Sequence, residues 1–218
     1  MDASTRFWDR NAARYARRAI ADPVAYQRKL AVTGQYLHRH MDVLEIGCGT
    51  GGTARFHAPR VHRYLATDIS PAMIRIARAR LAEQPAAGLT FQVASMESFQ
   101  GQCGTFDAVL GLSLLHLLPD LQAAVAQVFT MLKPGGVFIS NTVCMKDTRA
   151  WLRPVLGLAR CAGLAPPVTF LSRRELKCCL RDCGFELRHC WMPATTPDVV
   201  FLVAKKPNKS SEKGKEHR

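Results

Sequence analysis

The chain has 218 residues, of which 48% are hydrophobic and 22% are charged. This balance is typical of a globular protein with a buried core and excludes a disordered chain, a coiled coil and a collagen. No apolar run is long enough to cross a membrane, and the first ten residues lack the apolar core of a secretory signal. We therefore expect one cytoplasmic folded domain with short appendages.

The formal net charge of +13 is concentrated at the two ends of the chain. Residues 1–40 carry eight basic and three acidic side chains, and residues 205–218 carry six basic and two acidic ones. One interpretation is attraction to nucleic acid or anionic lipid, and the other is a solvated basic surface. Because residues 205–218 offer no large apolar side chain to bury, they predict a basic disordered tail.

Eight cysteines occur, and we interpret them as reduced and structural. Without a secretory signal, a disulfide framework is not expected. No CxxC pair is present, and Cys179 and Cys183 share a helical face with Leu176 and Leu180. Buried thiols pack as small hydrophobic groups, so packing is favoured over metal binding and no metal site is predicted.

Two helices are predicted at the beginning of the chain, where they would form an N-terminal helical cap over residues 1–40. Apolar residues at helical spacing from Trp8 to Ala19 indicate the first helix. Asp22 and Pro23 are typical of the start of a second helix, which we expect to run to about His40.

From residue 41 onward, short apolar strands alternate with helices. The predicted strands cover residues 41–46, 64–67, 89–94, 106–110 and 137–142, and helices are predicted over residues 70–81 and 119–131. The segment 134–136 is predicted to turn before the fifth strand. This alternation predicts an α/β fold: a Rossmann-like, doubly wound, mostly parallel sheet with helices on both faces.

The last part of the predicted core, which spans residues 41–204, departs from this alternation. Residues 143–171 form an amphipathic insertion that is either a substrate lid or interfacial helix, or a packed surface helix. Ser172 with Glu175 is a capping box for a helix ending at Gly184. Strands near 185–191 and 199–204 then predict an antiparallel hairpin at the edge of the sheet.

A glycine cluster follows the first predicted strand at Gly47, Gly49, Gly51 and Gly52. Glycines allow a tight turn and let a ligand lie against bare main chain, at the start of a helix that attracts anionic groups. GxGxxG followed by an acid at Asp68 is also the dinucleotide fingerprint. Three observations disfavour a dehydrogenase: an acid precedes the first glycine by two residues, a predicted turn over residues 132–136 precedes the fifth strand, and 218 residues leave no room for the usual substrate domain.

Four segments resemble the motifs of the class I S-adenosylmethionine-dependent methyltransferases. They are EIGCGTG at 45–51, DISPAM at 68–73, the strand and loop at 106–120, and LKPGG at 132–136. They occur in family order and spacing, and the resemblance spans about residues 5–204. The opening from Phe7 to Tyr15 is similar to the small-molecule branch that includes ubiquinone/menaquinone-type enzymes. The resemblance implies S-adenosyl-L-methionine as the cofactor.

The resemblance also implies cofactor-binding roles for individual residues. Asp68 should accept both ribose hydroxyls, and Glu45 should orient the ammonium group. Ile69 and Met73 should flank the adenine. Ser95 stands where the family often has an acid that binds the adenine amine, so recognition of that amine would depend on the Met96 N–H. For Met73 and Met96, core packing remains the alternative, as helix packing does for Tyr15. The predicted cofactor-binding residues are Tyr15, Glu45, Gly47, Cys48, Gly49, Gly51, Asp68, Ile69, Met73, Ser95, Met96 and Leu112.

Methyl transfer is an in-line displacement, so such a protein mainly aligns the acceptor and excludes water. His116 follows the fourth strand and is the predicted catalytic base, with capping or packing of its loop as the alternative. Cys144 and Asp147 are weaker candidates. The Asn-Pro-Pro-Tyr motif of amine-methylating DNA enzymes is absent, which argues against base flipping.

Apolar residues at 112–118 and 151–171 favour a small, apolar organic acceptor as the partner. Two alternatives stay open. One is a methyltransferase directed at RNA or protein, suggested by the basic charge. The other is a non-catalytic scaffold protein that keeps the cofactor fold.

Overall fold

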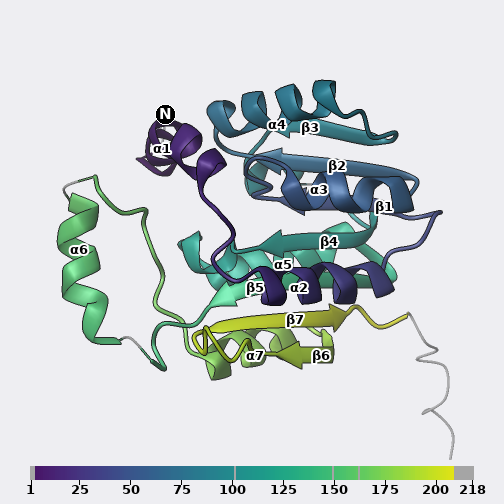
Figure 1. Ribbon diagram of the computed structural model, residues 1–218. Coiled ribbons are helices and arrows are strands. Elements are labelled where there is room, and N and C mark those ends of the chain that lie inside the picture. Colours follow the sequence, from purple (N-terminus) through teal and green to yellow (C-terminus); the bar gives the residue numbers. More distant parts are fainter. Residues whose placement is uncertain (1–2, 101, 149, 162, 209–218) are drawn as a thin grey trace, which may run out of the picture.

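The computed structural model describes residues 3–100, 102–148, 150–161 and 163–208. A seven-stranded sheet in the order β3-β2-β1-β4-β5-β7-β6 forms its centre (Figure 1). The first five strands of this order are parallel, and β7 is antiparallel to both β5 and β6. The strands are β1 (Asp42–Ile46), β2 (Arg63–Asp68), β3 (Leu89–Val93), β4 (Phe106–Leu112), β5 (Leu132–Val143), β6 (Glu186–Trp191) and β7 (Val199–Lys205).

Helices cover both faces of the sheet, as predicted. On one face α2, α3 and α4 bury apolar side chains against the strands, and on the other face α5 and α7 do so. Helix α1 lies over α4 and contributes Ala12 to a small cluster with Met73 (Figure 1). The helices are α1 (Ala3–Arg17), α2 (Pro23–Gln35), α3 (Gly52–His57), α4 (Pro71–Glu83), α5 (Leu121–Met131), α6 (Arg153–Cys161) and α7 (Arg173–Asp182).

The strand order reverses between β1 and β4, which are neighbours in the sheet. From β1 the chain proceeds outward to β2 and β3, and from β4 it proceeds the other way to β5. In open α/β sheets, ligands bind beyond the carboxyl ends of the strands at such a reversal. The fold therefore directs attention to the segments that follow Ile46 and Leu112.

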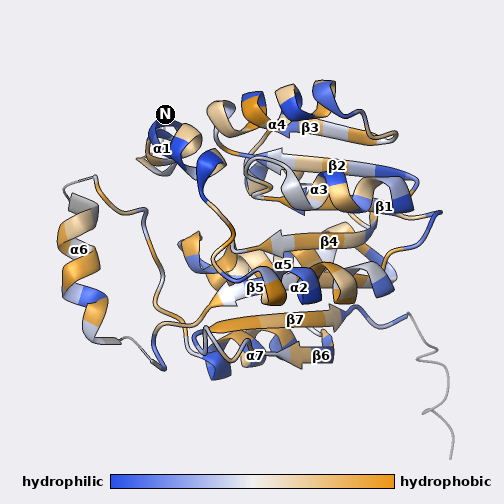
Figure 2. Cartoon of the chain, viewed as in Figure 1, coloured by the Kyte–Doolittle hydropathy of each residue, from blue (hydrophilic) through white to orange (hydrophobic). Residues whose placement is uncertain are grey.

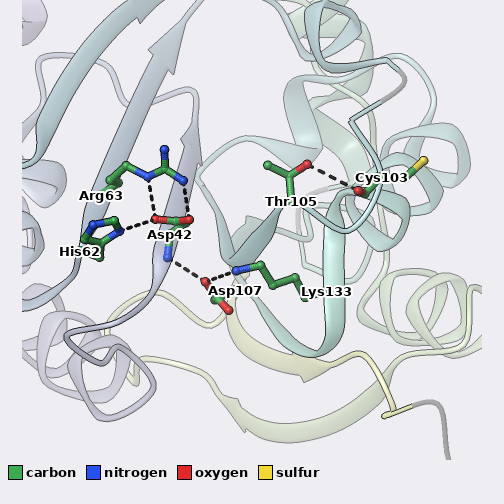
Figure 3. Close-up of polar contacts among 7 residues, drawn as sticks. All are labelled: Asp42, His62, Arg63, Cys103, Thr105, Asp107 and Lys133. Atoms are coloured by element: carbon green, nitrogen blue, oxygen red, sulfur yellow. Dashed lines mark hydrogen bonds and ion pairs between the residues drawn. The ribbon is translucent and has the colours of Figure 1, made fainter.

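The opposite, amino-terminal edge of the sheet is held by a polar network (Figure 3). Arg63 binds the Asp42 carboxylate through two nitrogens, at 2.9 and 2.7 Å. The Asp107 carboxylate accepts the Asp42 backbone N–H at 2.8 Å and pairs with the Lys133 ammonium at 2.7 Å. Since these residues begin four adjacent strands, this network joins the strands at the edge away from the expected site.

Two element boundaries differ from the sequence prediction. Helix α2 ends at Gln35 rather than near His40, because the backbone tightens after Gly34 and turns back toward β1. Strand β5 begins at Leu132, and the predicted turn at 134–136 lies inside it as a bulge. The bulge is opposite Phe106 and Ala108, where the register shifts, and Gly135 has φ +79°.

The capping box of α7 is confirmed: the Ser172 hydroxyl accepts the Glu175 N–H, and the Glu175 carboxylate accepts the Ser172 N–H. The C-terminal hairpin is also confirmed, with β7 at its centre and β6 at the edge. Lys205 ends β7, and Lys206 exchanges backbone hydrogen bonds with Gly135 and Gly136, so the first two residues of the predicted tail are held against β5. Residues 209–218 of that tail lie outside the described part of the chain.

Helix α6 stands apart from the sheet, in the insertion between β5 and α7 (Figure 2). It is amphipathic, and Val155 and Leu158 on it expose more than half of their side chains, as does Trp151 just before it. The lid interpretation and the division into cap, core and insertion stay predictions. Among the described residues, no helix is long and apolar enough to span a membrane.

Candidate functional site

The loop after β1 adopts a conformation that its glycines make accessible. Gly47, Gly49 and Gly51 have φ angles of +72°, +55° and +77°. Residues with side chains rarely adopt these angles. At Gly51, which is the N-cap of α3, a Cβ atom would lie 2.5 Å from the Phe91 ring. The loop is therefore built for bare main chain.

Asp68 ends β2 and is bonded to this loop. One carboxylate oxygen accepts the Gly49 N–H and the other accepts the Ser70 N–H, both at 2.9 Å. The residue is only 8% exposed, and burial raises the pKa of its carboxyl group. No cationic side chain of the described chain lies at ion-pair distance from it. Each oxygen keeps a lone pair that can accept a further hydrogen bond.

Glu45 lies on β1 and is 2% exposed. The Tyr64 hydroxyl donates to its carboxylate at 2.8 Å. Burial raises the pKa of Glu45 to about 7, while the hydrogen bond from Tyr64 opposes that shift. In the described part of the chain, no positive group pairs with this carboxylate, so it is suited to a ligand that brings its own positive charge.

A pocket of about 570 Å³ lies at the carboxyl ends of β1 and β4, closed by the end of α1 and by α2. It brings together five predicted residues: Tyr15, Glu45, Gly47, Cys48 and Leu112. The other predicted residues do not line it. They are Gly49, Gly51, Asp68, Ile69, Met73, Ser95, Met96 and His116.

Of the residues predicted to surround adenine, the two methionines are buried in hydrophobic clusters. Met73 packs with Ala12 between α1 and α4. Met96 belongs to the cluster on the α5 face, and its carbonyl accepts the Gln127 amide at 2.6 Å. Ile69 and Ser95 are half-buried. Their adenine-binding roles stay predictions.

His116 lies just after β4 and is buried. Its Nδ1 lies 3.5 Å from the Val143 N–H, and its carbonyl accepts the Thr169 N–H at 2.7 Å. Burial lowers its pKa to about 4, so the imidazole is neutral at physiological pH. These contacts connect it to β5 and to the insertion. Its role as a base stays a prediction.

Among the polar residues that line the pocket and that sequence reasoning missed are Arg18, Tyr26, Lys29, Arg80, Ser113 and Asn141. Tyr26 and Lys29 recur with Leu30 and Thr33 on one face of α2, which is a signal visible in the sequence. Burial lowers the pKa of Lys29. Asn141 is a polar residue within the apolar run of β5, which was the second available signal.

Ser113, directly after β4, and Asn141, near the end of β5, are hydrogen-bonded to each other. Ser113 has φ +59°, the only positive φ of a non-glycine residue among those described. Its N–H donates to the Asn141 carbonyl at 2.7 Å, and the Asn141 amide donates to its hydroxyl at 3.1 Å. The Asn141 Oδ1 atom is buried without a protein partner. Backbone strain and an unpaired polar atom commonly occur at ligand sites.

Helix α1 is anchored beside the site by Asp9. The Asp9 carboxylate accepts the Ser70 hydroxyl at 2.6 Å and the Ala72 N–H at 3.0 Å, at the start of α4. Tyr15 on the same helix is 47% exposed and would contact a Cβ atom at Gly49. The N-terminal helix thus closes one side of the pocket.

Comparisons with known proteins agree with this geometry. Residues 43–136 match the family model described as "Methyltransferase domain". A ubiquinone biosynthesis O-methyltransferase of Xanthomonas axonopodis pv. citri is 30% identical over 151 residues, which are 66% of this chain and 62% of that protein. A 2-heptyl-1-hydroxyquinolin-4(1H)-one methyltransferase of Mycobacteroides abscessus is 36% identical over 102 residues, 46% of this chain and 45% of that protein.

Solved structures of other proteins have a fold similar to that of this chain. An S-adenosylmethionine-dependent methyltransferase from Mesorhizobium loti has a TM-score of 0.69 at 19% identity, covering 84% of this chain and 99% of that one. The [4+2]-cyclase SpnF has a TM-score of 0.70 at 17% identity, covering 84% and 82%. At these identities the likeness concerns the fold alone. The chain spans about three fifths of the length of the Xanthomonas relative.

The sheet order, the glycine loop and the two acids beside it define the fold of a class I methyltransferase. The matched domain and the named relatives allow a closer statement. Residues 43–136 form a methyltransferase domain, and the chain is similar to class I S-adenosylmethionine-dependent methyltransferases that act on small molecules.

Proposed function

We propose that this protein transfers the methyl group of S-adenosyl-L-methionine to a small, apolar organic acceptor by in-line displacement. The observation that carries the proposal is the pair of buried carboxylates, Glu45 and Asp68, beside a glycine loop. Neither has a cationic protein partner in the described chain. Such groups suit a ligand that combines an ammonium group with hydroxyl groups.

The residues present fit this cofactor. Glu45 lines the pocket and would face the ammonium group, while the lone pairs left on Asp68 would accept the ribose hydroxyls. The main chain at Gly47 and Cys48 also lines the pocket and would hold the methionine part. When bound, the cofactor supplies a methyl group on a positively charged sulfur, which is an excellent leaving group.

The chain's own contribution to the reaction is positioning. Tyr15, Leu112 and α2 enclose the pocket, so they would exclude water and hold the acceptor in line. Lys29 and Asn141 would orient polar groups of the acceptor, because both line the pocket. Within the described residues, no polar side chain binds the Lys29 ammonium group or the Asn141 Oδ1 atom. The O-methyltransferase relatives support an oxygen atom as the nucleophile.

The first test is calorimetric binding of S-adenosylhomocysteine. We expect the wild type to bind, and Asp68→Asn to lose about tenfold to hundredfold in affinity, as expected when one hydrogen bond to a charged group is removed. Glu83→Gln, an exposed acid at the end of α4, is the matched control and should bind as the wild type. Absence of binding at millimolar ligand would refute the proposal.

The acceptor and the base need a second test. A cofactor-turnover screen with a library of small apolar metabolites should identify an acceptor. With an acceptor that must lose a proton, His116→Gln should lower kcat, and with an acceptor that brings no acidic proton it should not. Equal effects on both acceptors would make His116 a packing residue.

The alternative of an RNA- or protein-directed methyltransferase rests on the net charge of +13. We expect RNA to bind weakly, to be released steeply as salt increases, and to receive no methyl group. Methylation of RNA or protein in a cell extract would favour this alternative. Absence of turnover with every pool would favour a scaffold protein.

A further inference from the structure

A second pocket, of about 630 Å³, lies along α1. Seven of its lining residues come from α1 and the residue that follows it, and Pro166 comes from the segment between α6 and α7. Tyr15 and Arg18 line both this pocket and the one that holds Glu45. The two pockets are therefore adjacent, with Tyr15 and Arg18 at their common boundary.

An aromatic wall forms the apolar part of this second pocket. The Phe7 and Trp8 rings lie 5.2 Å apart at 87°, and the Trp8 and Tyr15 rings lie 6.2 Å apart at 88°. Edge-to-face rings of this kind form a rigid apolar surface. Such a surface suits a ring system or an alkyl chain.

Arginines form the polar part: Arg14, Arg17 and Arg18 line the pocket, and no acidic residue does. The Arg14 guanidinium donates to the Asn11 side-chain carbonyl at 2.5 Å, and the Asn11 amide donates to the Phe7 carbonyl at 2.7 Å. Asn11 therefore positions the guanidinium group without neutralising it. Asp9, the acid on the described part of α1, is bonded to the start of α4 instead.

We propose that this second pocket is the acceptor subsite for an acidic amphiphile, an apolar molecule that carries a carboxylate or a comparable anion. The apolar body lies on Phe7, Trp8 and Tyr15, and the anionic group binds the arginines, whose planar donors match carboxylate and sulfonate oxygens. This inference rests on the proposed function, and it narrows the acceptor from apolar to apolar and anionic.

Two dyes with the same aromatic rings test the inference on the full chain. 8-Anilinonaphthalene-1-sulfonate carries an anion, and N-phenyl-1-naphthylamine is its neutral counterpart. Both fluoresce more strongly in apolar sites. We expect the wild type to bind the anionic dye at least about tenfold more tightly, the ratio that 1.4 kcal/mol supplies.

Variants of the chain test whether the dyes bind in this pocket or on another surface. The double variant Arg14→Gln with Arg17→Gln should lower the affinity for the anionic dye about tenfold and leave the affinity for the neutral dye unchanged. Trp8→Ala should lower the affinity for both dyes. Arg39→Gln removes a single positive charge from an exposed turn after α2 and should change the affinity for neither dye. Equal affinity for the two dyes, or an unchanged anionic dye in the double variant, would overturn the inference. So would loss of binding in Trp151→Ala with Leu158→Ala on the α6 surface.

Failure of this inference is distinguishable from failure of the proposed function. Arg14 and Arg17 line the second pocket and not the pocket that holds Glu45. The double variant should therefore bind S-adenosylhomocysteine as the wild type does. If the wild type does not bind that ligand, the proposed function fails whatever the dyes show. If it binds the ligand but does not prefer the anionic dye, only the acidic class of acceptor is refuted.

Discussion

Glu45 is a carboxyl group whose burial changes how stability depends on pH. Its pKa is about 7 in the folded chain against an ordinary value of 4.5. As pH rises from 4.5 to 7, the unfolded chain releases this proton while the folded chain retains it. Folding stability therefore falls across this window, by up to about 3 kcal/mol, and the loss is complete above pH 7.

Glu45→Gln removes the titration and keeps an oxygen for the Tyr64 hydroxyl. We expect the variant to be more stable than the wild type above pH 7, by about 1–3 kcal/mol, and to have a flatter stability profile between pH 5 and 7. Urea unfolding at pH 5 and pH 8 measures this difference. Glu83→Gln should keep the wild-type profile, and an unchanged profile in Glu45→Gln would contradict the argument.

The same carboxyl predicts proton release on ligand binding. An ammonium group beside Glu45 favours its charged form, so S-adenosylhomocysteine should expel the proton near pH 6. Calorimetry in two buffers of different ionisation enthalpy measures the protons released. We expect a release close to one proton in the wild type and none from this site in Glu45→Gln. Equal values for both proteins would place the ammonium elsewhere.

At the scale of single residues, the sequence indicated the acids and glycines of the site but not the other polar side chains that line the pocket. Glu45, Gly49 and Asp68 stand at fixed offsets in one strand–helix–strand unit, so their pattern is visible along the chain. Lys29 and Asn141 reach the pocket from α2 and β5. No local pattern encodes that meeting, because it depends on how a helix packs against the sheet.

At the scale of elements, Gly51 is the residue at which the glycine loop passes into α3, and the position requires a residue without a side chain. Gly51→Ala places a Cβ atom 2.5 Å from the Phe91 ring at φ +77°. We expect a loss of at least about 2 kcal/mol of unfolding free energy, from backbone strain together with overpacking. Denaturant titration measures it.

Gly104 supplies the matched control for this substitution. It has φ +58°, and a Cβ atom there has no neighbour within 4 Å. Gly104→Ala should therefore show the backbone penalty alone, about 1 kcal/mol. If the two variants lose equal stability, the contact with Phe91 has no energetic weight.

The helices and strands were predictable from neighbouring residues, but two of their boundaries were not. Caps at Asp22, Ser70 and Ser172 marked helix starts correctly, since each side chain accepts a backbone N–H of its own first turn. The end of α2 and the bulge in β5 depend on where the chain must meet the next strand. Such boundaries are set by tertiary contacts rather than by neighbouring residues.

At the scale of the whole molecule, β7 completes the sheet from the end of the chain. It lies between β5 and β6, and Phe201 on it is fully buried beside Trp191 and His189. Phe201→Ala should lower the unfolding free energy by about 3–5 kcal/mol in one cooperative transition. Calorimetric melting checks both the size and the single transition.

Phe56 on α3 serves as the comparison, because the same ring is 40% exposed there. Phe56→Ala should cost about 1 kcal/mol or less. Two separate transitions in Phe201→Ala would mean that the C-terminal hairpin unfolds independently of the parallel strands.

The sequence by itself determined the alternation of strands and helices, the glycine loop, and the acids at Glu45 and Asp68, because each is encoded in neighbouring residues and their spacing. Only the tertiary structure decided which side chains share a pocket. It also showed that Met73 and Met96 are packed within hydrophobic clusters and that arginines line a second pocket along α1. The physical reason is that burial and pairing depend on contacts between segments distant in the chain, which the local pattern does not specify.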